Sequence, residues 1–243
     1  MSDPCRLTLA DDVLGAALAH AQAEYPRESC GLVVRVDGAQ RYRPCRNLAD
    51  GQAHFVLAPE DYARAEGEGE VVAVVHSHPN AAPEPSEADR VMMERWGLPW
   101  LILNVPVGHW RLWYPDGYRP PLVGRTFSHG VLDCYSLIQD YYRERLGLAL
   151  PDFERPDDWW AKGGNLYLEG FGRAGFVDVT GQPPREHDVL LMQLRAPVPN
   201  HAGVYLGGDV LLHHVMGRLS TRETYSGFWE RITQRVVRHA SRC

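Results

Sequence analysis

The chain has 243 residues and a mass of 27.4 kDa, with 44% hydrophobic and 23% charged residues. This length and composition predict a soluble protein with two globular domains and exclude a largely disordered chain. The formal net charge of -6 leaves no basic excess for binding phosphate backbones or anionic lipid, so nucleic acid is not an expected partner.

The amino-terminal residues lack both a basic region and an apolar region, so we expect no signal peptide and synthesis in the cytosol. The most apolar stretch, residues 98–108, is too short to cross a bilayer and contains two prolines, which predicts no membrane span. The cysteines are odd in number and irregularly spaced, a pattern typical of reduced thiols; they are Cys5, Cys30, Cys45, Cys134 and Cys243.

Hydrophobic periodicity predicts alternating helices and strands over the first half of the chain. A helix is expected at about residues 12–24, where apolar residues at helical spacing follow an aspartate. Apolar, mostly β-branched runs predict buried strands at residues 30–36, 71–78 and 99–107. Two further helices are expected at residues 58–68 and 86–97, each beginning with proline or serine and early acids.

A turn signal at residues 115–117, followed by Pro120 and Pro121, predicts a domain boundary, giving domains of residues 1–118 and 119–243. No internal repeat relates the two halves. Beyond the boundary, the pattern predicts a helix at residues 132–147, strands at 187–194, 201–208 and 209–215, and an edge strand in the carboxyl-terminal tail.

Two histidines and an aspartate in the first half predict a metal site. His76 and His78 occupy alternate positions at the end of a strand, so their side chains project from one face. Asp89 lies in the next predicted helix, which can bring its carboxylate to the imidazoles. Three protein ligands leave one tetrahedral position open, as in catalytic zinc sites, where bound water has a pKa of about 7.

Two further residues have candidate roles at this site. Glu28 precedes a buried strand that can lie beside the histidine strand, which makes it a candidate proton shuttle. Ser86 is a candidate for stabilising the developing oxyanion, although Ser86 with Asp89 is also a plausible helix-capping pair.

The spacing H-x-H-x7-S-x2-D, formed by His76, His78, Ser86 and Asp89, resembles the signature of the JAMM (MPN+) metallopeptidases. Pro79 and the P-x-E-x-C-G context of Glu28 extend the resemblance, which covers roughly residues 1–118. It implies a deaminase-like α/β sheet domain, zinc held by the two histidines and the aspartate, and water activated by Glu28. The implied reaction is hydrolysis of an amide or isopeptide bond.

A cysteine and two histidines in the second half predict a nucleophilic site. Cys134 begins a predicted helix, where the helix dipole favours a thiolate. His201 and His213 lie on consecutive predicted strands joined by a turn, so His213 can orient His201, which in turn takes the proton of Cys134. The alternative is a half-buried cysteine with two strand histidines. His214 projects from the opposite face, which predicts a structural or solvated role.

The D-C-x-S-L run at residues 133–137, the H-x-G-V-Y-L-G run from His201 and the later His213 resemble NlpC-type papain-like cysteine peptidases over about residues 122–243. The resemblance implies a papain-like α+β domain that cuts peptidoglycan stem peptides. Two departures stand out. His187 replaces a glycine often found there, and the tyrosine common about a dozen residues before the cysteine is absent, so Phe127 or a backbone amide is expected to fill its place.

The two halves together resemble tail assembly proteins of lambda-type long-tailed phages. The resemblance implies an α+β protein of two domains that uses Zn2+, is made in the host cytoplasm and is located at the virion tail tip. Its implied partners are phage tail-tip proteins and a peptidoglycan or peptide substrate. Two alternatives remain open: a protease that processes a tail protein, and a non-catalytic structural component of the tail tip.

Overall fold

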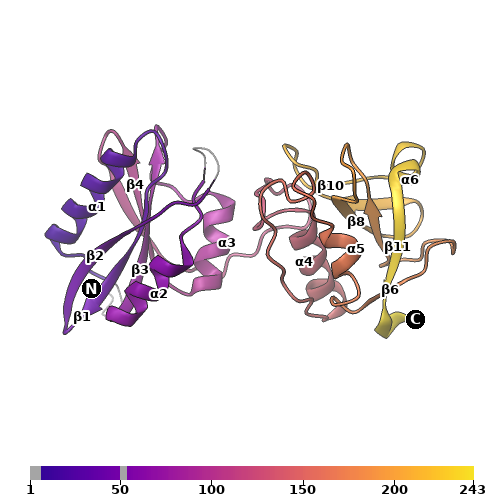
Figure 1. The fold of residues 1–243 in the computed structure, drawn as a ribbon, viewed down its shortest axis with the longest axis horizontal. Helices are drawn as coiled ribbons and strands as arrows, with labels where there is room; N and C mark the ends of the chain where they lie inside the picture. Colours follow the sequence, from indigo (N-terminus) through magenta and orange to yellow (C-terminus); the bar gives the residue numbers. More distant parts are fainter. Residues whose placement is uncertain (1–6, 50–53) are drawn as a thin grey trace. The chain divides into compact units, whose positions relative to one another are not determined.

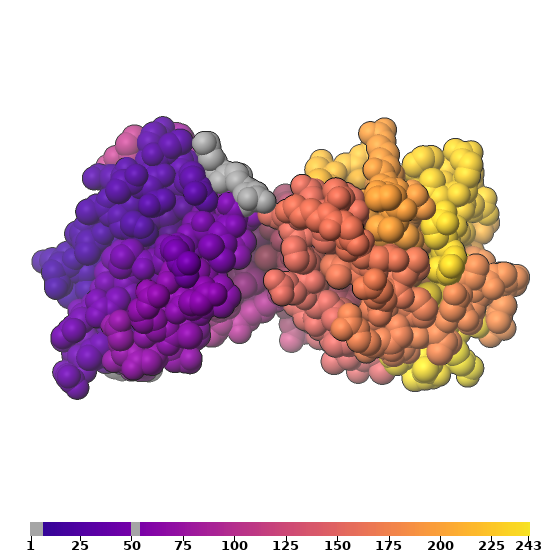
Figure 2. Space-filling view, in the orientation of Figure 1, coloured from indigo at the N-terminus to yellow at the C-terminus, as the bar shows by residue number. Residues whose placement is uncertain are grey.

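The computed structural model describes residues 7–49 and 54–243, and chain contacts divide the protein into two compact units, Met1–Arg119 (unit 1) and Pro120–Cys243 (unit 2). Each unit has its own sheet and helices (Figure 1) and forms a filled body of side chains (Figure 2). Within the described residues, no helix has the length and apolar character needed to cross a membrane.

Unit 1 is built on a mixed five-stranded sheet in the order β2-β1-β3-β4-β5, in which only β3 and β4 run parallel. Its elements in chain order are α1 (Asp11–Glu24), β1 (Cys30–Val36), β2 (Ala39–Cys45), α2 (Pro59–Glu68), β3 (Glu70–Pro79), α3 (Glu87–Trp96), β4 (Trp100–Val105) and β5 (Trp110–Trp113). The three helices and three strands predicted from periodicity are confirmed.

Helices cover both faces of this sheet, as expected for strands that are apolar on both sides. On one face, Val13 and Ala17 of α1 pack against Val33, Val75 and Leu103. On the other face, α2 and α3 cover the alternate strand residues, among them Leu32, Val74 and Trp100. The central strand β3 is therefore buried over residues 72–77, and its two histidines lie near its carboxyl end.

Unit 2 is built on a six-stranded antiparallel sheet in the order β10-β9-β8-β7-β11-β6. Its elements are α4 (Cys134–Leu146), α5 (Leu166–Gly170), β6 (Phe176–Asp178), β7 (Val189–Met192), β8 (His201–Tyr205), β9 (Val210–His213), β10 (Thr221–Thr224), α6 (Phe228–Ile232), β11 (Thr233–His239) and the 3-10 turn η1 (Ala240–Arg242). The predicted helix and three predicted strands are confirmed.

Helix α4 packs on one face of this sheet through Leu137, Ile138 and Tyr141, which contact strand residues such as Val189 and Ala202. The helix ends at Gly147, whose φ of 65° places it in the left-handed region that glycine tolerates. The prediction of an edge strand in the tail is wrong. Strand β11 lies between β7 and β6, and it buries the side chains of Val236 and Val237 on opposite faces of the sheet.

Candidate metal centre and cysteine site

In unit 1, the ends of β3 and α3 bring His76, His78 and Asp89 together, and their ligand atoms lie within 4.8 Å of one another. The two imidazoles project from one face of β3 because they are two residues apart on an extended strand. Asp89 lies in the first turn of α3, which directly follows the loop after β3. The predicted convergence of these three side chains is present in the structure.

The separations of these atoms match a tetrahedral zinc site. The Nε2 atoms of His76 and His78 are 2.9 Å apart, and the Asp89 carboxylate oxygens lie 3.6 Å from His76 Nε2 and 3.4 Å from His78 Nε2. Ligands at about 2.0–2.1 Å from zinc with tetrahedral angles are separated by about 3.3–3.4 Å. The three measured distances bracket that value, so the donor set fits zinc.

The contacts of the two histidine rings direct both Nε2 atoms toward the metal site. His78 Nδ1 lies 3.1 Å from the carbonyl oxygen of Ala82, and since a carbonyl only accepts, Nδ1 carries the proton and Nε2 keeps its lone pair. His76 is fully buried, stacked on Phe55 with ring centroids 4.9 Å apart and edge-on to Trp100. Its Nδ1 has no hydrogen-bond partner among the described residues, so Nε2 makes its polar contacts.

Ser86 and Asp89 form the capping box of α3. The Ser86 hydroxyl and backbone N–H both donate to Asp89 Oδ2, at 2.7 and 2.8 Å, and the Asp89 N–H donates back to Ser86 Oγ. Burial alone would raise the pKa of Asp89, but the charge of His76 and the hydrogen bonds hold it well below its usual range. The cap thus orients an ionised carboxylate toward the imidazoles, and Ser86 contacts a ligand rather than an open space.

Glu28 lies two residues before β1, which pairs antiparallel with β3 in a register that matches Cys30 to His76. Continuing that register sets Glu28 opposite His78 at the edge of the metal cluster. Its side chain is buried, and burial raises its pKa, while the nearby charges of His76 and His78 act in the opposite direction. A carboxyl with a raised pKa beside the cluster can both accept and return a proton.

In unit 2, Cys134 is the first residue of α4, and Asp133 caps the helix by accepting from the backbone N–H of Ser136 at 2.9 Å. The thiol lies 2.9 Å from the hydroxyl of Tyr167 and against the backbone of Ala202, the residue after His201. The helix start was expected to favour a thiolate, but burial outweighs it and raises the pKa of Cys134 to about 11. The resting thiol is therefore protonated at neutral pH.

The two histidines on β8 and β9 contact each other, with His201 Nε2 3.1 Å from His213 Nδ1. Gly203 pairs with His213 across the strands, and a Cβ at Gly203 would lie 2.9 Å from the Cβ of His213, so glycine permits this close approach. Beyond them, His213 Nε2 is 3.6 Å from Glu223, and Trp229 packs edge-on to the His213 ring at 4.5 Å. The result is a chain from one buried imidazole to a second buried imidazole to a half-buried carboxylate.

Burial lowers the pKa of His201 to about 3, and the charges of His213 and His214 add to that shift. His201 is therefore neutral at pH 7 and able to accept a proton. His214 is also buried, with Nε2 3.2 Å from the carbonyl oxygen of Arg218 and its ring against Phe127. The Phe127 ring lies against His214, and the side chain that contacts the thiol is Tyr167.

A buried ion pair fixes the start of α4. Arg155 Nε donates to Asp133 Oδ2 at 2.7 Å, and the side chains are 6% and 3% exposed. Burial acts to raise the pKa of Asp133, but Arg155 and backbone hydrogen bonds outweigh it and lower that pKa. The same guanidinium donates to the carbonyl of Gly130, so it joins the loop before the helix to the loop around residue 155.

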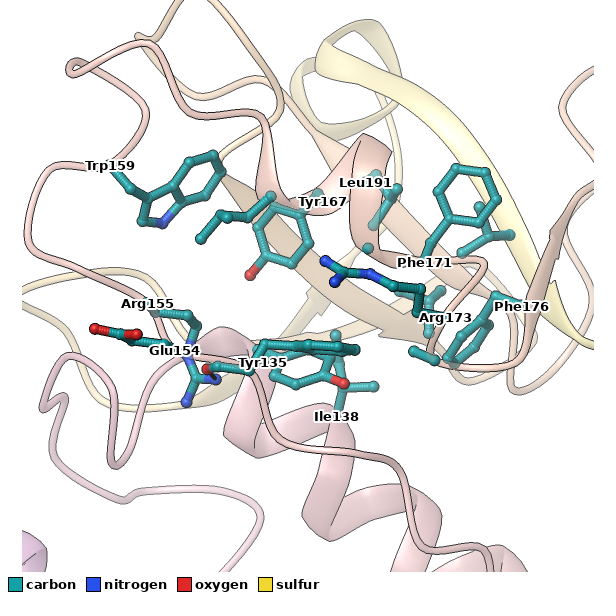
Figure 3. Close-up of a pocket in the computed structure, with 16 residues that line it drawn as sticks. Tyr135, Ile138, Glu154, Arg155, Trp159, Tyr167, Phe171, Arg173, Phe176 and Leu191 are labelled. Atoms are coloured by element: carbon teal, nitrogen blue, oxygen red, sulfur yellow. Dashed lines mark hydrogen bonds between the residues drawn. The ribbon is translucent and has the colours of Figure 1, made fainter.

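Beside this site is a cavity of about 260 Å3 with mainly apolar walls, several of them aromatic (Figure 3). Tyr135, Trp159, Tyr167 and Phe171 are among its lining residues, and Arg173 extends across it. The Tyr167 ring forms one wall, and its hydroxyl is turned away from Phe171 (Figure 3). Tyr167 therefore belongs both to the cavity wall and to the surroundings of the thiol.

Three contributors to the cysteine site were not predicted: Tyr167, Glu223 and Arg155. Tyr167 is 33 residues from Cys134 in sequence, in a stretch without a strong periodic pattern, so no local signal indicates the contact. Glu223 could have been found from strand alternation, because it lies on the strand that pairs with the one carrying His213.

Comparison with known proteins decides the family. Residues 10–115 match the model for prokaryotic homologs of the JAB domain, and residues 124–238 match the NlpC/P60 family. The chain is 44% identical over 229 residues to tail tip assembly protein K of Escherichia phage N15, covering 93% of each chain. It is also 44% identical over 184 residues to the protein K of Escherichia phage lambda, covering 75% of this chain and 89% of that one.

The chain belongs to the tail tip assembly protein K family. It joins a JAB/MPN domain to an NlpC/P60 domain, and the two sheets described above are these domains. Both are domains of peptidase families. The JAB half is also 33% identical over 92 residues to a desampylase of Pyrococcus furiosus, a match that covers 35% of this chain and 65% of that protein.

Proposed function

We propose that this K protein is a tail-tip component with two hydrolytic sites. Unit 1 carries a zinc-dependent site for amide or isopeptide bonds, and unit 2 carries a Cys-His site for peptidoglycan stem peptides. The observation that carries the proposal is the convergence of His76, His78 and Asp89 at separations that fit zinc. The peptidase-family matches of both halves support a hydrolytic use of these sites.

In unit 1, His76, His78 and Asp89 would hold the zinc, which when bound supplies a Lewis acid and a water acidic enough to deprotonate near neutral pH. Glu28 accepts the proton from the attacking water and gives it to the leaving amine. Ser86 is assigned the role of donor to the developing oxyanion. Its hydroxyl now donates to Asp89, so this role requires it to rotate toward the substrate.

In unit 2, neutral His201 takes the proton of Cys134, and His213 holds the His201 ring in place. The thiolate attacks the amide carbon of the substrate, forming a C–S bond and placing the electron pair on oxygen. When the C–N bond breaks, the amine leaves with the proton held by His201. Water, deprotonated by His201, then hydrolyses the thioester and restores the thiol.

The names of the relatives support a proposal for where the protein acts. The proteins of phages N15 and lambda are tail tip assembly proteins, so we place this chain in the host cytoplasm during assembly and afterwards at the virion tail tip, in contact with other tail proteins. Cleavage of cell-wall peptides by unit 2 would then occur where the tail meets the wall.

The test is mass analysis of fragments released from purified peptidoglycan by the wild-type protein, Cys134→Ala and Glu28→Gln. We expect peptide-bond cleavage by wild type and Glu28→Gln and none by Cys134→Ala. Cys243→Ala, which removes an exposed thiol, is the matched control and should cleave like wild type. Absence of cleavage by the wild-type protein contradicts wall hydrolysis and directs the search to peptide bonds of tail proteins.

A further inference from the structure

We infer that Tyr167 is a catalytic residue of the cysteine site, where its hydroxyl hydrogen-bonds first to the Cys134 thiolate and then to the acyl oxyanion. This inference rests on the proposed function of unit 2 and adds a residue that the sequence motif does not contain. The observation behind it is the 2.9 Å separation of the Tyr167 hydroxyl and Cys134 Sγ. No other side chain among the described residues makes a hydrogen bond to this thiol.

Burial increases the contribution of this hydrogen bond to the stability of a Cys134 thiolate. The thiol is buried and the tyrosine is half-buried, so a thiolate formed there has little access to water as a donor and depends on protein groups. The Tyr167 hydroxyl opposes the effect of burial on the pKa of Cys134, as does the backbone of Ala202. Hydrogen bonds to a charged group in such surroundings are stronger than those to a neutral one.

The same hydroxyl is placed to meet the oxyanion. When Sγ bonds to the carbonyl carbon, the carbonyl oxygen lies within about 3 Å of the sulfur, so a donor beside Sγ is also beside the new negative charge. The second donor is the backbone N–H of Cys134, one of the unpaired N–H groups at the start of α4. Tyr167 thus supplies a tyrosine hydroxyl from α5 in a chain that lacks the tyrosine common before the cysteine.

The ring of Tyr167 is held independently of its hydroxyl. It contacts Trp159 with ring centroids 5.8 Å apart and forms part of the cavity wall (Figure 3). Tyr167→Phe keeps these contacts and removes only the hydroxyl. Tyr142→Phe is the matched control, because this buried tyrosine on α4 donates to the backbone carbonyl of His187 instead.

Two rates separate the two roles. Alkylation of Cys134 by iodoacetamide at pH 8, followed by peptide mass spectrometry, requires a thiolate but forms no oxyanion. Loss of a charge-assisted hydrogen bond, partly offset by the greater nucleophilicity of a more basic thiolate, predicts alkylation about 3–15-fold slower in Tyr167→Phe. Hydrolysis of wall peptide should fall about 10²–10³-fold, because an oxyanion donor is lost as well.

Several outcomes overturn the inference. Alkylation of Tyr167→Phe that equals or exceeds that of wild type and Tyr142→Phe shows that the hydroxyl only covers the thiol. If the hydrolysis rate of Tyr167→Phe falls by no more than its alkylation rate, the hydroxyl does not stabilise the oxyanion. If wild type cleaves no wall peptide, the proposed function fails while the alkylation comparison still decides the thiolate role. Should Tyr167→Phe fail to fold, 3-fluorotyrosine at this position, a stronger donor, must accelerate alkylation.

Discussion

Arg155→Met should destabilise unit 2 strongly, because it leaves the Asp133 carboxylate buried without its counter-charge. The two side chains are 2.7 Å apart and almost wholly buried. Removing one partner of such a pair costs about 3–5 kcal/mol, and methionine retains the volume of the arginine stem. Native-state hydrogen exchange of α4 peptides should therefore become about 10²–10⁴-fold faster.

The control is Arg143→Met on the same helix, whose ion pair with Asp140 leaves its own side chain 55% exposed. An exposed pair contributes about 0–1 kcal/mol, so exchange in this variant should stay within about fivefold of wild type. Asp133→Asn combined with Arg155→Met should recover part of the loss, because the buried charge is removed. Similar exchange rates in Arg155→Met and Arg143→Met would show that burial does not strengthen the Asp133–Arg155 ion pair.

Three further predictions concern single positions. Gly203→Ala should lower the unfolding free energy by about 1–3 kcal/mol, because the added Cβ would meet the backbone of β9. Gly172→Ala is the control, since a Cβ at Gly172 would enter open space and should have no such cost. Equal costs in the two variants would contradict the close approach of the strands at Gly203. The unfolded state binds more protons at His201, because burial lowers the pKa in the folded state from 6.5 to about 3. The unfolding free energy is therefore highest above pH 6.5 and falls as the pH drops below that value. Between pH 7.5 and 5, wild type should lose about 2 kcal/mol more unfolding free energy than His201→Gln, and parallel losses would exclude this linkage. The Glu28→Gln protein should retain zinc, while its hydrolysis of isopeptide bonds falls about 10²–10⁴-fold because the proton acceptor is lost. If this variant loses the metal instead, Glu28 is a metal ligand rather than a proton shuttle.

The parts of the fold that the sequence predicts are those encoded locally. The metal cluster is an example, because strand alternation places His76 and His78 on one face, and the Ser86 cap places Asp89 in the first turn of the next helix. Each step depends on neighbours within about a dozen residues. The apolar character of both strands predicts that β1 lies beside β3, but the register that brings Glu28 to the cluster has no local signal in the sequence.

The parts that escape prediction depend on contacts between distant segments. Strand β11 resembles an edge strand because basic and apolar residues alternate in it, but β6, a three-residue strand with no pattern of its own, covers its outer side. Tyr167 reaches Cys134 from a five-residue helix after a long irregular connection. The protonation of Cys134 likewise follows from burial, which outweighs the helix dipole and is not visible in the sequence.

The chemistry proposed for unit 1 depends on a zinc ion held where the ends of β3 and α3 meet. The most direct test is the metal content of the purified chain after zinc loading and dialysis, measured by mass spectrometry for wild type and for His76→Ala with His78→Ala. The expected result is about one zinc ion per chain in wild type and none in the double variant, because the remaining carboxylate cannot hold the metal alone. A wild-type chain without zinc, or equal zinc in both proteins, would contradict it.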